Sequence, residues 1–75
     1  MIDKNSTKEE VLEAVSRDGW LLKFASDKLR NDKDVVLEAV KQDEYTLLWA
    51  SNELRNNKDF MMLVDEIKKG VKNDK

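Results

Sequence analysis

The sequence predicts an all-α fold in which a short helix-turn-helix unit is repeated with a period of 25 residues. Three observations lead to this prediction. Residues 7–31 and 32–56 are identical at 13 of 25 positions, which indicates a duplication. Proline is absent and only two glycines occur, so little interrupts helices built from Leu, Ala, Glu and Lys. Apolar residues recur at helical spacing within each copy. We therefore expect about five helices, stacked as a small right-handed α-solenoid-like array.

Matched capping residues indicate where the helices begin. Residues of good N-cap type stand at one position of successive copies, as Thr7, Asp32 and Asn57. Glu10 follows Thr7 by three residues and completes a capping box. Asp18 and Asp43 supply a second N-cap inside each copy. These signals predict helices over residues 8–17, 19–30, 33–42, 44–55 and 58–71.

We expect a single domain with three parts. They are repeat 1 (residues 7–31), repeat 2 (32–56) and a C-terminal capping helix (57–72), which together span residues 7–72. Residues 1–6 and 73–75 are predicted to be disordered tails. One position distinguishes the copies, because Glu10 becomes Val35 and then Phe60. A charge in the first copy predicts an exposed outer face, and the apolar residues predict burial in the later copies.

The second helix of each copy is apolar over most of its circumference, which predicts neighbours on more than one side. We expect its aliphatic residues to face the first helix of the same copy. The aromatic residues are expected to form the core between the repeats, and they are Trp20, Phe24, Tyr45 and Trp49. The residues predicted to be almost fully buried are Val15, Leu22, Phe24, Leu29, Val40, Leu47, Trp49 and Leu54.

The composition argues against an enzyme. The chain has no Cys and no His, which removes the strongest nucleophile and the commonest general base. Neither a nucleophile–base pair nor a glycine-rich phosphate loop is present. We therefore expect no catalytic residue, metal, cofactor or small-molecule substrate. No apolar run approaches the roughly 20 residues of a membrane span, so a cytoplasmic protein without membrane contact is expected.

The charge distribution argues against nucleic acid as the main partner. The formal net charge is −2, whereas nucleic-acid binding depends on neutralising phosphates. A weak anion or nucleic-acid site is the alternative, formed by the repeated Arg-Asn helix ends and the Lys-rich C-terminus. The leading expectation is an unidentified protein partner. We expect a monomer, with weak homo-oligomerisation as the alternative.

Three apolar residues are candidates for binding that partner, namely Leu48, Met61 and Met62. Leu48 falls within the polar side of its helix, where the first copy has Lys23. The two Met residues lie outside the apolar stripe of the last helix, and Met is common at adaptable binding surfaces. Either the three residues form an exposed patch, or the last helix covers Leu48 and no such patch exists. We expect the last helix to cover Leu48 and to leave at least one Met exposed.

The repeated frame V-L-E-A-V…D-x-W-x-L-x-F-A-S-x-x-L-R-N-D-K-D-V-V-L-E-A-V resembles the tandem repeats of a domain-of-unknown-function family, DUF4116. The resemblance covers about residues 7–64. It implies a helical repeat array without catalytic motifs, and it carries no functional residue over to this chain. The expected function is therefore that of a non-catalytic module, which binds a protein partner or forms a structural segment of a larger array.

Overall fold

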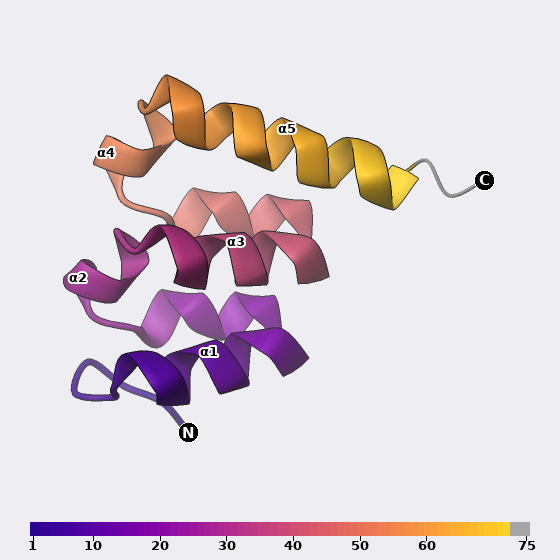
Figure 1. The fold of residues 1–75 in the computed structure, drawn as a ribbon. Coiled ribbons are helices and arrows are strands. Elements are labelled where there is room, and N and C mark those ends of the chain that lie inside the picture. Colours follow the sequence, from indigo (N-terminus) through magenta and orange to yellow (C-terminus); the bar gives the residue numbers. More distant parts are fainter. Residues whose placement is uncertain (73–75) are drawn as a thin grey trace.

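The computed structural model describes residues 1–72 and places seven helices in them (Figure 1). They are α1 (Lys8–Arg17), the 3-10 helix η1 (Gly19–Phe24), α2 (Asp27–Arg30), α3 (Lys33–Gln42), the 3-10 helix η2 (Glu44–Trp49), α4 (Asn52–Arg55) and α5 (Lys58–Lys72). No strand occurs in this part of the chain, so the predicted all-α class is confirmed. The prediction of about five helices is wrong. The tail predicted over residues 73–75 lies outside the described residues.

The two extra helices arise because the second helix of each copy is broken into a 3-10 helix and one α-helical turn. The backbone is extended at Ala25 and Ala50, with ψ angles of 163° and 158°. Ser26 and Ser51 follow, and each hydroxyl accepts a hydrogen bond from the N–H three residues later. Serine favours helix starts because its hydroxyl competes with the backbone for hydrogen bonds. Each Ala-Ser pair therefore starts a new helix, where the sequence pattern had suggested a continuous one.

The predicted N-caps are present. The Thr7 hydroxyl accepts from the Glu10 N–H, and the Glu10 carboxylate accepts from the Thr7 N–H, which completes the capping box. The other predicted caps also accept backbone N–H groups of the helices they start, and these are Asp18, Asp32, Asp43 and Asn57. Each cap satisfies donors that a helix start otherwise leaves without partners.

The helices lie in successive layers (Figure 1). The longer helices α1, α3 and α5 form one column, and η1 and η2 lie behind α1 and α3. The central helix α3 packs against α1, both 3-10 helices, α2 and α5. The N-terminal segment, expected to be a tail, has contacts of its own. Ile2 packs against the core, and the Asp3 N–H donates to the Ser6 hydroxyl at 2.9 Å.

The core is mainly aliphatic, and it includes the buried aromatic side chain of Phe60. Of the residues predicted to be buried, five are confirmed, namely Val15, Leu22, Leu29, Val40 and Leu54. Three are wrong, because Phe24 is 37% exposed and Leu47 and Trp49 are only partly buried. Beyond that list, the buried apolar residues are Val11, Ala25, Val36, Ala39, Ala50 and Val64, together with Val35 and Phe60, whose burial the comparison of the copies predicted. The exchange from Glu10 to Val35 and Phe60 follows the prediction, since only Glu10 is exposed.

The expected aromatic core is wrong for a geometric reason. A 3-10 helix has three residues per turn, so residues i and i+3 lie in line. Gly19, Leu22 and Ala25 have this spacing, and all three are buried. Trp20 and Phe24 lie off this line, and each is 37% exposed. The 100° spacing of an α-helix had placed these aromatic residues on a buried face.

Gly19 is required by a close backbone approach between the copies. A Cβ atom at this position would lie 2.7 Å from the Ala39 carbonyl oxygen and 3.2 Å from the Thr46 methyl carbon. Thr46 is fully buried, and its hydroxyl donates to the Asp43 carbonyl at 2.8 Å. The start of η1 therefore rests directly on the backbone of α3.

The first prediction concerns Leu29 and Leu54, which anchor the short helices α2 and α4 in the core. Replacing either with Ala removes buried methyl groups and leaves a cavity, so each variant should lose about 2–5 kcal/mol of unfolding free energy. Urea unfolding followed by circular dichroism measures this loss. A loss below about 1 kcal/mol at both sites would contradict the described core.

The second prediction concerns the two glycines. Gly19→Ala should cost about 1–3 kcal/mol, because the added methyl meets a backbone oxygen that cannot move aside easily. Gly70→Ala is the control, since no atom lies within 4 Å of a Cβ there. That change should leave the stability unchanged or raise it by up to about 1 kcal/mol. Equal effects of the two substitutions in thermal or urea unfolding would show that the close approach is absent.

Candidate functional site

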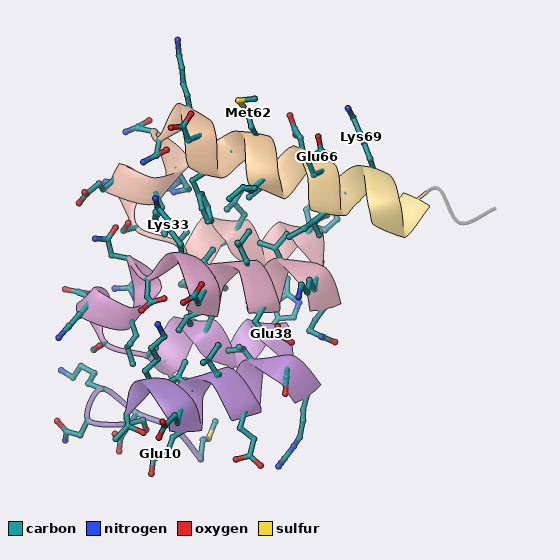
Figure 2. All side chains as sticks on the ribbon, in the orientation of Figure 1. Glu10, Lys33, Glu38, Met62, Glu66 and Lys69 are labelled. Carbon is teal, nitrogen blue, oxygen red and sulfur yellow. The ribbon has the colours of Figure 1, made fainter. Side chains whose placement is uncertain are left out.

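The three candidate partner-binding residues do not form one patch. Leu48 is 52% exposed, and Met62 is 65% exposed. Figure 2 shows Met62 on the outer side of α5, pointing away from the other helices. Met61 is partly buried and packs against the core. The expectation that α5 covers Leu48 is wrong, whereas the expectation of at least one exposed Met is confirmed.

Leu48 is exposed because α5 packs on α3 and α4, and η2 is not among its main neighbours. In the first copy, Gly19 lets η1 approach the backbone of the next long helix. The matching residue of the second copy is Glu44. Glu44 lines a small cleft of about 100 Å³ together with Val40 and Ile67. The second copy therefore lacks the glycine that allows the close approach in the first copy.

The junction between the copies shows what the end of a copy can bind. The Ser51 N–H donates to the Arg30 carbonyl at 2.9 Å, and the Arg30 guanidinium donates to the Trp49 carbonyl at 3.5 Å. The Ser51 hydroxyl donates to the Asn31 side-chain oxygen, whose amide nitrogen donates to the Glu53 carboxylate at 3.4 Å. Two residues at the end of α2 therefore hold the start of α4 through four hydrogen bonds.

Two further contacts join the copies. The Trp20 indole N–H donates to the Asp43 carboxylate at 2.9 Å. The Lys8 ammonium lies 3.1 Å from the carboxylates of both Asp32 and Asp34. The Asp43 carboxylate also caps η2, so it accepts from both copies at once. These contacts connect polar groups that flank the aliphatic core on either side.

The same positions are more exposed in the second copy. Tyr45 is 69% exposed, whereas the matching Trp20 is 37% exposed. Arg55 is exposed, whereas Arg30 is only partly so. Tyr45, Leu48, Arg55 and Asn56 together are called the η2–α4 edge below, and all four are exposed. The end of the second copy therefore carries binding groups that the first copy uses in its junction.

A depression of about 370 Å³ lies beside this edge. Its lining includes Leu48 and both arginines, Arg30 and Arg55. The Arg30 guanidinium also pairs with Asp27, and the Arg55 guanidinium donates to the Asn52 side chain. The arginines of the two predicted Arg-Asn helix ends therefore line one depression, although the Asp27 carboxylate compensates one of the two charges.

The Lys8 contact changes the ionisation of Asp32. Burial by itself raises the pKa of the Asp32 carboxyl. Its hydrogen bonds from Lys8 and from the N–H groups of Val35 and Asp34 outweigh burial and hold this pKa below its ordinary value of 3.8. The hydrogen bonds to Asp32 and Asp34 raise the pKa of Lys8. The pair therefore stabilises the contact between α1 and α3 through its charged form.

The described residues contain no cluster of three or more His, Cys, Asp or Glu side chains that could hold a metal ion. None of the helices in residues 1–72 is both long enough and apolar enough to cross a membrane. The polar features of the fold are helix caps and contacts between the copies. The geometry thus describes a helical protein with an exposed edge at the end of its second copy.

The comparisons with known proteins identify the family. The model of a domain of unknown function, DUF4116, matches residues 7–55 and again residues 34–75. The chain therefore belongs to the DUF4116 family. Neither a curated protein nor a solved structure matches it.

The third prediction concerns pH. Because the pKa of Asp32 is lower in the folded chain, its ionised form stabilises the fold above about pH 4, and this contribution is lost as the pH falls through the folded-state pKa. Asp32→Asn keeps an N-cap residue and removes the charge. The variant should lose less than about 1 kcal/mol at neutral pH, because both side chains of the Lys8–Asp32 pair remain in contact with solvent. Urea unfolding at acidic pH should show no difference from the parent, and an undiminished difference there would contradict the assignment.

Proposed function

We propose that this chain is a non-catalytic helical repeat module that binds a protein partner through the η2–α4 edge. The supporting observation is the contrast between matched positions. Arg30 and Asn31 donate hydrogen bonds to residues of the second copy, whereas within residues 1–72 the side chains of Arg55 and Asn56 form no hydrogen bond outside α4. Exposed apolar and aromatic residues beside arginine are typical of protein interfaces.

A structural role in a larger repeat array is a form of the same proposal. α5 already takes the place of the first helix of a further copy, so only the second, broken helix of such a copy would meet the η2–α4 edge, and it would continue the layers as a right-handed solenoid. In such arrays each unit contacts only its neighbours, so the end of one unit serves as the binding surface for the next. The two forms share one surface and differ only in the chain that covers it.

A weak anion or nucleic-acid site is the second candidate. It is favoured by one observation, namely that Arg30 and Arg55 line the same depression. The carboxylate of Asp27 lines it too, and the net charge of the chain is −2. Both features weaken phosphate binding, because its free energy comes chiefly from neutralised phosphates. Protein binding is therefore the better-supported function.

The fourth prediction tests the edge with matched variants. Quantitative affinity capture from native lysate should retain a partner on the parent chain and lose it on Leu48→Asp. Met62→Asp is the control, because Met62 is also an exposed apolar residue but lies on the outer side of α5 (Figure 2). Both changes place a charge on an exposed residue, so their effect on stability should stay within about 0.5 kcal/mol.

Loss of the same partner from both variants, or from neither, would contradict binding through the edge. Titration with a labelled oligonucleotide at several salt concentrations examines the second candidate. Tight binding with a steep salt dependence would favour nucleic acid over protein.

A further inference from the structure

We infer that the η2–α4 edge recognises the start of a helix in a partner protein, with an aromatic-Ala-Ser-x-Glu pattern of side chains. This inference rests on the proposed function and specifies the chemistry of the partner. It comes from the junction between the two copies, where residues 49–53 of the chain carry this pattern.

The first step is what the first copy binds. Arg30 offers a carbonyl that accepts the Ser51 N–H and a guanidinium that donates to the Trp49 carbonyl. Asn31 accepts from the Ser51 hydroxyl and donates to Glu53. Arg30 and Asn31 therefore recognise three features of this segment, namely its extended turn, its serine N-cap and the acidic residue in its first helical turn. These features also stabilise a helix start by themselves.

The second step is that the second copy presents the same groups. Arg55 and Asn56 match Arg30 and Asn31 in sequence. They stand at the end of α4, as Arg30 and Asn31 stand at the end of α2. Both are exposed. Within residues 1–72, no backbone or side-chain donor is bonded to the Arg55 carbonyl outside its own helix. The carbonyl that binds the serine N–H in the first junction is thus available in the second copy.

The third step concerns the aromatic residue of the partner. In the first junction, the Lys23 ammonium lies 5.9 Å from the centre of the Trp49 ring. Leu48 takes the place of Lys23 in the second copy and is exposed. An aromatic side chain docked at this position would cover Leu48 by apolar contact instead of a cation–π interaction. The exchange therefore keeps the preference for an aromatic residue and explains why Leu48 is apolar.

The fourth step excludes a whole second copy in the same register. A copy that placed η1 on η2 would also bring α1, which packs beside η1. That α1 would fall on α5, which already lies over α3 (Figure 1). A short segment has no such helix before it and avoids this overlap. The occupant is therefore a helix start of another protein, rather than this chain repeated end to end.

The experiment uses a synthetic peptide with the sequence of residues 43–56, blocked at both ends, as the probe. The peptide is titrated into the ¹⁵N-labelled full chain and followed by NMR. We expect saturable shifts of the amides of Leu48, Arg55 and Asn56, with a Kd of about 1 mM or tighter. A peptide with Ala for the serine and Lys for the glutamate should bind at least about tenfold more weakly.

Two protein variants complete the test. Arg55→Glu should weaken peptide binding at least about tenfold, because it removes the guanidinium and repels the acidic residue. Arg17→Glu is the matched control, since Arg17 is an exposed arginine at the end of α1. This control should bind the peptide as the parent does. Equal affinity of the parent and Arg55→Glu, or shifts confined to other helices, would overturn the inference.

A free peptide has to be ordered on binding, and a second probe reduces that cost. The same segment is attached to the C-terminus of the chain through a flexible glycine–serine linker, which raises its effective concentration to about the millimolar range. The edge amides should then shift without added peptide. Absence of shifts in both formats overturns the inference. If Leu48→Asp still loses a captured partner in that case, the proposed function stands, and only the proposed pattern of partner side chains is wrong.

Discussion

The close approach of η1 to α3 is the constraint on which the rest of the structure depends. Without a side chain at Gly19, the 3-10 helix rests on the Ala39 carbonyl, and a buried line of Gly19, Leu22 and Ala25 faces the core. This contact sets how near the second copy lies to the first. The hydrogen bonds from Ser51 to Arg30 and from Trp20 to Asp43 then form at normal lengths on either side. Packing at one backbone contact thus positions the polar contacts around it.

The second copy ends differently. Glu44 stands where Gly19 does, α5 packs mainly on α3 and α4, and η2 stays partly uncovered. The end of the second copy is thus an exposed edge, where the first copy has a closed junction. Evolution of a repeat can create a binding surface in this way, because the groups that recognise the next unit remain when that unit no longer fits.

The sequence predicted the fold class, the long helices and five of the seven N-caps in residues 1–72, because those features depend on local residue types and on the period of 25. It did not predict the breaks at Ser26 and Ser51, since a serine within an apolar pattern suits an exposed helix position equally well. The prediction also assumed α-helical spacing where the structure has 3-10 helices, so it wrongly placed Phe24 and the other aromatic residues in the core. Of the candidate site, Leu48 was identified by comparing copies, whereas the role of Arg55 needed the contacts of Arg30.

Amide hydrogen exchange at two matched serines tests the central account most directly. The Ser51 N–H donates to the Arg30 carbonyl across the junction, whereas the Ser26 N–H has no bonded acceptor within residues 1–72. The account predicts that Ser51 exchanges only with opening of the junction, at least about a hundredfold more slowly than Ser26 after correction for local sequence. Similar exchange of the two amides would contradict a junction closed by the approach of η1 to α3.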